Sequence, residues 1–222
     1  MIVQKQGLFV VFTGAPGCGK GTQAQILQKK TGIPHISTGA ILRQYVQTET
    51  AKGQKLREKL AKGELVSDDI VCSLLKERIN QSDCRNGFIL DGFPRTLSQA
   101  ETLMRILSEK GIKLNCALEI QVPDEIIEER ILGRYTCMQC GAGYHDKFQQ
   151  TKVYGVCDNC GGVEFSRRQD DNREIVRQRL LNYRLQTYPT IPFFASKGLL
   201  KTVDGTGTIQ AVSNRIAEVL HI

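Results

Sequence analysis

A glycine-rich segment near the amino terminus has the composition of a phosphate-binding loop. It reads Gly-Ala-Pro-Gly-Cys-Gly-Lys-Gly-Thr-Gln over residues 14–23, between an apolar run at 8–12 and a helical pattern that begins near Lys20. Glycines let backbone N–H groups turn toward an anion, a helix start adds its positive dipole end, and a lysine can reach the outer phosphates. The segment therefore predicts a site for a phosphorylated ligand. In the general pattern a hydroxyl directly follows the lysine, whereas here Gly21 follows and the hydroxyl comes at Thr22.

Four cysteines form a second group, whose spacing suits a metal ion. Cys137 and Cys140 make one Cys-x-x-Cys pair, Cys157 and Cys160 make another, and a glycine follows each pair. Two such knuckles complete a tetrahedron of thiolates, which predicts structural zinc. Four thiolates leave no open position for a substrate, so a catalytic metal is not expected. Iron in the same site stays open as an alternative, whereas disulfides do not suit a reducing cytosol.

The other cysteines and the histidines predict no further site. Cys72, Cys84 and Cys116 stand in apolar or helical contexts and are expected to be small core residues. Cys18 lies inside the glycine-rich segment, where a filler role is favoured over thiol modification. The histidines are scattered, and His145, near the four cysteines, is superfluous as a fifth ligand.

Several arginines occur in motif positions of a chain whose net charge is +7. The guanidinium fork matches the geometry of phosphate oxygens, so these arginines favour anionic substrates. Small phosphorylated molecules are favoured over nucleic acid, because aromatic residues make up 6% of the chain and tryptophan is absent. The arginines are Arg95, Arg130, Arg134, Arg168 and Arg179. Spacing to Asp170 and Asp171 favours Arg168 over the adjacent Arg167.

A nucleoside triphosphate on the glycine-rich segment needs an acceptor for its γ-phosphoryl group. A hydroxyl or water acceptor requires a base, whereas a phosphate acceptor is already anionic near neutral pH and needs only cations. No His-Arg-Asp loop of the protein-kinase kind is visible, and arginines are plentiful. The residues therefore favour a phosphate acceptor, with several rigid donors around the transferring group.

Five short apolar runs predict the strands that must position these residues, at 8–13, 35–37, 88–91, 116–122 and 200–204. Helical patterns separate them, and residues 8–12 and 88–90 are continuously apolar, as in parallel strands covered on both faces. We therefore expect an α/β fold with a doubly wound, five-stranded parallel sheet. Such sheets bind ligands beyond the carboxyl ends of their strands, where Gly14, Thr38 and Asp91 are expected to lie.

Two segments interrupt the alternation of strands and helices. Residues 38–66 are lysine-rich and helical in pattern, which predicts a small helical insertion, and residues 133–171 have no helical period, which predicts a loop-rich one. A capping box at Asp171-Asn-Arg-Glu174 then predicts a helix that runs to about Thr187. The expected core domain is residues 1–37, 67–132 and 172–222.

The composition also bears on where the protein works. A hydrophobic share of 41% is ordinary for a globular protein, and no apolar run approaches the ~18 residues of a membrane helix. The amino-terminal residues lack the pattern of a secretion signal. We therefore expect a cytoplasmic protein, a monomer by default, that spans no membrane.

Together these motifs resemble those of the adenylate kinase family, in its bacterial long-lid form with a zinc-binding lid. The resemblance spans the whole chain and includes the late hydroxyl, since Gly-Lys-Gly-Thr is that family's own version of the loop. It implies a P-loop NTPase fold in which 38–66 binds AMP and 133–171 forms the lid. It also implies reversible transfer, ATP plus AMP giving two ADP, with Mg²⁺ on the ATP phosphates, in adenine nucleotide homeostasis. The motifs are residues 14–23, Ser37-Thr-Gly39 with Leu42-Arg43, Asp91-Gly-Phe-Pro-Arg-Thr96 and Arg168-Gln-Asp-Asp171.

The resemblance also implies roles on the donor side. Lys20 and the loop amides would hold the ATP phosphates, Asp91 would orient the magnesium shell through water, and Arg130 or Arg134 would also face the adenine. The implied catalytic residues are Lys20, Asp91, Arg95, Arg130, Arg134, Arg168 and Arg179. The implied ATP contacts are Gly17, Cys18, Gly19, Lys20, Gly21, Thr22, Arg130, Arg134, Gly143, Tyr144 and Gly207.

On the acceptor side, the resemblance implies that Gln99 reads the adenine edge of AMP. The implied AMP contacts are Thr38, Arg43, Glu64, Leu65, Val66, Gly92, Phe93, Pro94, Arg95, Gln99, Arg168 and Arg179. The sequence departs from the family pattern at Ala40, where most relatives have aspartate. We therefore expect the entry to residues 38–66 to be anchored differently.

Three alternatives stay open. One is a kinase of another nucleoside monophosphate, and a second uses GTP as the donor to AMP. The third, from a different class, is a zinc-ribbon nucleic-acid protein powered by a P-loop, for which aromatic and basic residues near the cysteines give some support. Thr38 and Gln99 favour AMP, and the long lid argues against the short-lid pyrimidine kinases.

Overall fold

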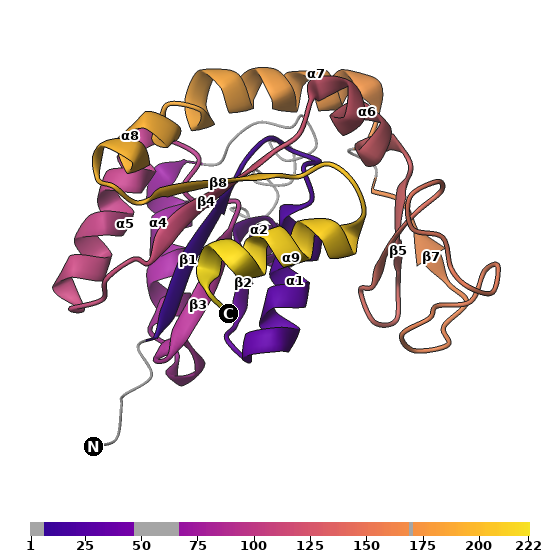
Figure 1. The fold of residues 1–222 in the computed structure, drawn as a ribbon, viewed down its shortest axis with the longest axis horizontal. Helices are drawn as coiled ribbons and strands as arrows, with labels where there is room; N and C mark the ends of the chain where they lie inside the picture. The colour runs from indigo at the N-terminus through magenta and orange to yellow at the C-terminus, as the bar shows by residue number, and fades with distance from the viewer. Residues whose placement is uncertain (1–6, 47–66, 169–170) are drawn as a thin grey trace.

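The centre of the molecule is a parallel sheet whose strands follow the order β2-β3-β1-β4-β8 (Figure 1). The computed structural model describes residues 7–46, 67–168 and 171–222, apart from the side chains of residues 43–46. The strands are β1 (Leu8–Thr13), β2 (His35–Ser37), β3 (Gly87–Asp91), β4 (Cys116–Gln121) and β8 (Leu200–Asp204). The predicted α/β fold with five parallel strands is confirmed, and each strand lies within one residue of its expected bounds.

Helices cover both faces of the sheet, because successive strand residues point to opposite sides. Phe9 and Val11 pack with residues of α2, α4, α5 and α8 on one face, whereas Val10 and Phe12 pack with residues of α1 and α9 on the other. Strand residues buried on both faces explain the continuously apolar runs. The helices of these layers are α1 (Lys20–Thr31), α2 (Thr38–Val46), α4 (Asp68–Ile79), α5 (Leu97–Glu109), α8 (Thr190–Ser196) and α9 (Ile209–Leu220), with a short 3₁₀ turn η1 (Ser82–Cys84) before β3.

A smaller unit projects from the sheet between two helices. The chain leaves the core through α6 (Asp124–Leu132) and returns through α7 (Arg173–Asn182), and these helices contact each other (Figure 1). Between them lies an antiparallel sheet in the order β6-β5-β7, made of β5 (Arg134–Cys137), β6 (Gly143–His145) and β7 (Phe165–Ser166). The sequence predicts a loop-rich insertion here and gives no sign of these strands. These strands are two to four residues long, too short to show a period.

The helix after this unit begins one residue later than the capping box predicts. Asn172 is the cap, and its Oδ1 accepts a hydrogen bond from the Ile175 amide at 3.0 Å. The expected cap at Asp171 is wrong, because both carboxylate oxygens of Asp171 bind Arg134 instead. Beyond α7 the helix continues through a π-helical turn, η2 (Tyr183–Thr187), and so ends near Thr187 as expected.

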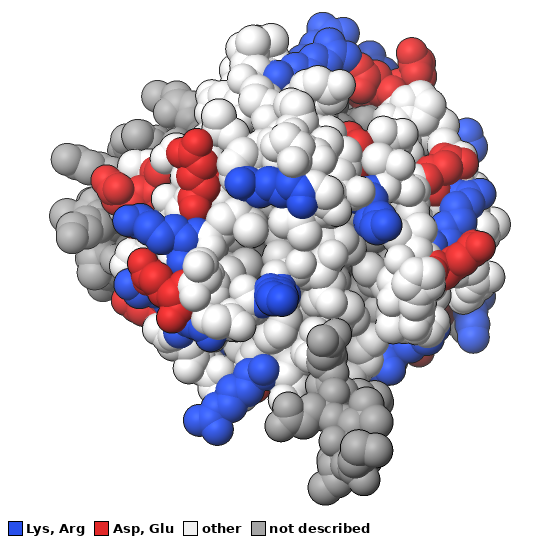
Figure 2. Space-filling view, turned by 60° about the vertical axis from the view of Figure 1, so that its left-hand side comes forward, with Lys and Arg blue, Asp and Glu red and all other residues white. Residues whose placement is uncertain are grey.

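Charged side chains are spread over the surface. On the face shown in Figure 2, lysines and arginines stand among aspartates and glutamates and do not gather into a patch of one sign. Large apolar side chains are exposed on the smaller unit, such as Tyr154, and on the π-helical turn η2, such as Leu185. In the ranges that the structure describes, no helix is both long and apolar enough to cross a membrane.

Candidate active site and metal centre

The glycine-rich loop lies between the end of β1 and the start of α1, as predicted. Gly14, Gly17 and Gly19 all have positive φ, the conformation that glycine adopts without strain. A Cβ at Gly14 would stand 2.5 Å from the carbonyl oxygen of Ile120, so the loop fits this close to β4 only with glycine. Gly19 precedes the first turn of α1 and has no side chain to cap its N–H groups. Those N–H groups are thus positioned to bind an anion.

Lys20 folds back over the same loop. Its Nζ donates hydrogen bonds to the carbonyl oxygens of Gly14 at 2.7 Å and Ala15 at 2.8 Å. Cys18 is 1% exposed beneath it, with Sγ 3.5 Å from the ammonium, which agrees with the predicted filler role. The ammonium is held where a phosphate on the loop would meet it.

Asp91 stands at the carboxyl end of β3, beside β1, where Phe12 is its register partner. Its Oδ2 lies 3.3 Å from Nε2 of His35, a residue of the next strand, β2. Burial opposes ionisation of Asp91, but the hydrogen bond with His35 and the positive charges of Lys20 and Arg95 outweigh it and hold the pKa of the carboxyl below its usual range. Asp91 is therefore an anion at neutral pH, close to the phosphate loop.

The segment after β3 is fixed by hydrogen bonds from three directions. Thr38 Oγ1 donates to the Gly92 carbonyl at 2.8 Å, and Arg95 Nε donates to the same oxygen at 2.9 Å. The Arg95 amide donates to Gln99 Oε1 at 2.7 Å, and Thr187 Oγ1 donates to the Arg95 carbonyl at 2.9 Å. Backbone and side chain of Arg95 are thus both anchored before any ligand arrives.

Arginines from the hinge of the smaller unit and from α7 surround one buried carboxylate. Arg134 binds both oxygens of Asp171, and Nη1 of Arg179 lies 3.5 Å from Oδ1 of the same residue. The Asp171 side chain is 3% exposed. Arg130 takes another course, with Nη2 donating to the Gly205 carbonyl at 3.0 Å. Burial lowers the pKa of Arg130, but a guanidinium stays charged at neutral pH.

A cleft of about 1160 Å³ lies among these groups, larger than the roughly 300–1,000 Å³ of a typical small-ligand site. It contains the phosphate loop at one wall, the segment after β3 at another, and residues of the smaller unit across from both. Thus the fold brings together most predicted site residues. Those lining the cleft are Gly17, Cys18, Gly19, Lys20, Gly21, Thr22, Asp91, Gly92, Pro94, Arg95, Arg130, Arg134, Gly143, Tyr144, Arg168, Arg179 and Gly207.

Several predicted AMP contacts do not line this cleft. Gln99 is 2% exposed, and its Nε2 donates to Asp68 Oδ1 at 2.6 Å, so both ends of its amide have protein partners. Phe93 is 1% exposed, and Thr38 is buried. The side chain of Arg43 and residues Glu64, Leu65 and Val66 lie outside the described part. Their roles, and that of Gln99, stay predictions.

The four predicted metal ligands come together in the smaller unit. All four Sγ atoms lie within 4.8 Å of one another, with Cys137 to Cys160 at 3.7 Å and Cys140 to Cys157 at 3.5 Å. The edge of a zinc–thiolate tetrahedron with Zn–S bonds of about 2.3 Å is about 3.8 Å, so the cluster fits zinc. The knuckles repeat each other, since Gly141 N donates to Cys137 O at 3.0 Å and Gly161 N to Cys157 O at 2.8 Å. Within the cluster, the hydrogen bond with Tyr144 lowers the pKa of the Cys157 thiol, whereas burial and the neighbouring thiols raise that of Cys160.

The sequence does not reveal three residues that hold predicted site residues in place, His35 at Asp91, Asp171 at Arg134 and Thr187 at Arg95. In the sequence His35 belongs to no motif, Asp171 has the spacing of a helix cap, and Thr187 marks no more than a helix end. The only signal for His35 was its place one strand away from Asp91 in a parallel sheet. Both ring nitrogens of His145 have protein partners, since Nδ1 accepts from the Lys147 amide at 2.9 Å and Nε2 lies 3.1 Å from the Glu129 carbonyl.

Comparison with known proteins gives one consistent result. The profile of the adenylate kinase family matches residues 12–199. A protein named adenylate kinase from Allorhizobium ampelinum is 50% identical over 211 residues, which cover 95% of this chain and 98% of the relative. A second protein named adenylate kinase, from Paramagnetospirillum magneticum, is 51% identical over 95% of this chain and 97% of the relative. A third, from Thermodesulfovibrio yellowstonii, is 48% identical over 96% of this chain and 98% of the relative.

The environment of Asp91 predicts an acid-dependent contribution to stability. Because its folded pKa lies below the unfolded value of about 3.9, its ionised form stabilises the fold above that pH, and this contribution is lost as the pH falls through the folded pKa. The free energy of unfolding of the wild type, minus that of Asp91→Asn, should therefore decrease from about pH 5 to pH 3. Urea unfolding across this range measures it. A difference that grows toward acid would contradict the assignment.

Proposed function

The chain belongs to the adenylate kinase family and is a nucleoside monophosphate kinase, and we propose that its cleft transfers a phosphoryl group reversibly between ATP and AMP, giving two ADP. The observation that carries this proposal is the gathering of the phosphate loop and five arginines around one cleft. A cleft of this size has room for two nucleotides. We assign the oriented carboxylate in the lining, Asp91 held by His35, to magnesium, because a phosphate acceptor needs no base.

We propose that the donor nucleotide places its phosphates on the loop. The N–H groups at the start of α1 and the Lys20 ammonium would bind the β- and γ-phosphates, and Lys20 would exchange the carbonyls of Gly14 and Ala15 for phosphate oxygens. Arg130 and Arg134, with Gly143, Tyr144 and Gly207, would bound the rest of the nucleotide. The hydrogen bond from Arg130 to the Gly205 carbonyl supports this, because it fixes that arginine next to Gly207.

The acceptor is proposed to bind across the loop after β3. Arg95 spans this loop by its Nε bond to the Gly92 carbonyl, and it lines the cleft. Thr38 and Gly92 would fix the entry to the insertion at 38–66, and a hydrogen bond from the Ala40 amide to Ser37 Oγ at 3.4 Å accounts for an anchor without the family's aspartate. Any reading of adenine by Gln99 would require its bond to Asp68 to break.

Transfer itself would depend on fixed positive charge. In a loose transition state, negative charge spreads over the equatorial oxygens, and rigid cations in a site without water stabilise it without reorganisation. Arg95 is held by its own loop and Arg179 by Asp171. Because Asp171 is almost fully buried, it positions two arginines and does not reach solvent itself. We propose that phosphate replaces part of this pairing when both nucleotides bind.

Magnesium and zinc would have separate sites. The Asp91 carboxylate, ionised beside the loop, offers the hard oxygen that Mg²⁺ prefers, and it would hold the ion through water. The bound ion would neutralise part of the negative charge on the ATP phosphates. The four cysteines would hold zinc, which organises a unit with few buried apolar residues. Iron is the alternative occupant, since a set of four thiolates accepts it as well.

The division of labour proposed for the chain follows the same lines. Residues 1–37, 67–132 and 172–222 form the core, 38–66 holds AMP, and 133–171 closes over ATP and excludes water that would otherwise accept the phosphoryl group. We propose a monomer in the cytoplasm; that none of the eight cysteines forms a disulfide suits a reducing compartment. We propose nucleotides and not nucleic acid as partners, because aromatic residues that could stack on bases are few.

The acceptor preference tests the proposal directly. We expect ADP to form from ATP with AMP as acceptor, at a kcat/KM at least tenfold above those with UMP, CMP or GMP, because the motif residues Thr38 and Gln99 match AMP. A coupled assay of ADP formation measures each pair, and GTP in place of ATP tests the donor. Activity with UMP or CMP but not AMP would overturn the proposal.

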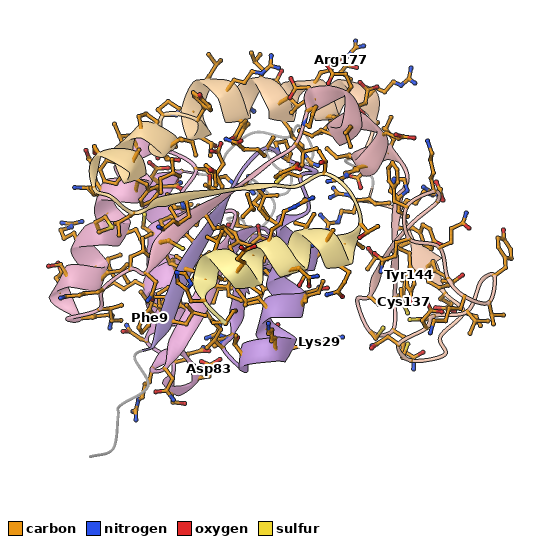
Figure 3. The ribbon with its side chains drawn as sticks, in the orientation of Figure 1. Phe9, Lys29, Asp83, Cys137, Tyr144 and Arg177 are labelled. Carbon is orange, nitrogen blue, oxygen red and sulfur yellow. The ribbon has the colours of Figure 1, made fainter. Side chains whose placement is uncertain are left out.

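Two arginines on α7 provide a matched test of the charge cage. Arg179 lines the cleft and contacts Asp171, whereas Arg177, two residues earlier, is exposed and points outward (Figure 3). Arg179→Ala should lower kcat by roughly 10²–10³-fold, the usual cost of one transition-state donor. Arg177→Ala should stay within about twofold. Equal effects of the two substitutions would show that position in the cleft does not matter.

Loss of a cysteine ligand should affect stability more than chemistry. Cys137→Ala removes one thiolate from the cluster, so we expect the melting temperature to fall by roughly 5–10 °C, or about 2–4 kcal/mol, with a smaller effect on turnover at low temperature. Cys72→Ala, outside the cluster, is the control. Metal analysis of both purified variants completes the experiment. Turnover abolished at an unchanged melting temperature would contradict a structural metal.

A further inference from the structure

Tyr144 contacts both the cleft and the four-cysteine cluster. It lies on β6, lines the cleft, and is 5% exposed. Its hydroxyl oxygen is 3.3 Å from Sγ of Cys157, which is itself 2% exposed. Figure 3 shows Tyr144 directly beside Cys137, another of the four cysteines. One side chain therefore joins the wall of the cleft to the metal centre.

The direction of the hydrogen bond follows from the other partner of the hydroxyl. The backbone N–H of Asp158 donates to the Tyr144 oxygen at 2.7 Å. A phenol has one proton, and an N–H donor already occupies the accepting side of this oxygen, so the proton is free to point to Cys157. A metal-bound thiolate carries no proton and can only accept. In the metal-loaded protein the bond therefore runs from the Tyr144 O–H to the sulfur.

The ring of Tyr144 is held in place by two other aromatic side chains. Tyr135 stacks on it with centroids 5.7 Å apart and an angle of 20°, and Phe165 meets it edge-on at 5.7 Å and 81°. These contacts fix the ring, so the hydrogen bond from the hydroxyl to the sulfur costs little additional rotamer freedom. The burial of Cys157 keeps water from replacing the donor.

The cluster needs such donors because of its charge. Four thiolates around one divalent ion leave a net charge of −2, and hydrogen bonds to sulfur offset it in a partly buried site. Among the described residues, side-chain donors reach two of the four sulfurs, since the Tyr144 hydroxyl meets Cys157 and the Asn159 amide meets Cys140. Of these two donors, Tyr144 is the one that also lines the cleft.

We propose that Tyr144 is a positioning residue of the metal centre, which holds the sulfur of Cys157 on the metal by an O–H to sulfur hydrogen bond and so slows loss of the ion. The inference rests on the proposed zinc site. It assigns Tyr144 a role beyond contact with ATP. The same hydroxyl joins the ring in the cleft wall to a ligand of the metal.

Substitution of the hydroxyl in the full, zinc-loaded chain tests the inference. Tyr144→Phe keeps the ring and removes the proton donor, and Tyr135→Phe is the matched control, a neighbouring ring in the same cleft wall whose hydroxyl binds no sulfur. Zinc release into an excess of a coloured chelator should be about tenfold faster for Tyr144→Phe, as is usual when a hydrogen-bond partner of a metal ligand is lost. Tyr135→Phe should stay within about twofold of wild type.

A spectroscopic readout separates this role from general loosening of the fold. In the cobalt-substituted protein, the sulfur-to-cobalt charge-transfer band should shift to lower energy in Tyr144→Phe, because a sulfur without its hydrogen bond gives up electron density more readily. The band of Tyr135→Phe should not move. If Tyr144→Phe folds poorly, 4-fluorophenylalanine at position 144 keeps a polar group without a proton and should give the same shift.

The outcomes distinguish this inference from the proposed function. Wild-type release rates and an unshifted band in Tyr144→Phe would overturn the inference and leave the zinc site standing. A wild-type protein that binds neither zinc nor cobalt would overturn both the zinc site and the inference. Neither measurement uses nucleotides, so neither outcome bears on the transfer between ATP and AMP.

Discussion

Parallel pairing of β1 with β3 and β4 is the constraint on which the site depends. The register sets Phe12 opposite Asp91 and Thr13 opposite Glu119, so the three strands end at one edge. The backbone turns there with Gly14 packed against the Ile120 carbonyl, which starts the phosphate loop in contact with β4. A sheet covered on both faces holds these ends rigidly, because each strand residue is packed from two sides. The phosphate loop, Asp91 and Arg95 are thereby positioned before ligands bind.

Positive charge in the cleft is balanced by a small number of buried acceptors. Asp171 binds Arg134 and lies beside Arg179, the Gly205 carbonyl binds Arg130, and the Gly92 carbonyl binds Arg95. Each of these partners holds an arginine in place, and in the proposed reaction phosphate oxygens would take over part of this pairing. This arrangement suits a reaction that needs rigid cations and no base. It also explains why Asp171 is buried and does not serve as a helix cap.

The smaller unit depends on a different kind of interaction. Its buried apolar residues are few, with Tyr144, Cys137 and Cys157 as the buried members and Tyr135 and Phe165 packed around them. Apolar burial alone is too small to offset the conformational entropy that is lost when the loops of such a unit become ordered. The two knuckles bring four sulfurs together, and a metal ion bound there would supply the missing stabilisation. Because Tyr144 belongs both to this cluster and to the cleft wall, the four-cysteine cluster and the cleft are in direct contact.

The sequence by itself determined the five parallel strands, the phosphate loop and the four-cysteine cluster, because apolar runs, glycines and paired cysteines act over a few neighbouring residues. It could not show that His35 meets Asp91, that Asp171 binds Arg134, or that the Tyr144 hydroxyl reaches Cys157. His35 and Asp91 lie on two different strands, and Arg134 lies on a strand whereas Asp171 precedes a helix. Tyr144 lies on a strand and Cys157 in one of the two cysteine knuckles. Only the tertiary structure decided these pairs, since a side chain's partner depends on which segments pack together, and burial then allows each polar group few partners.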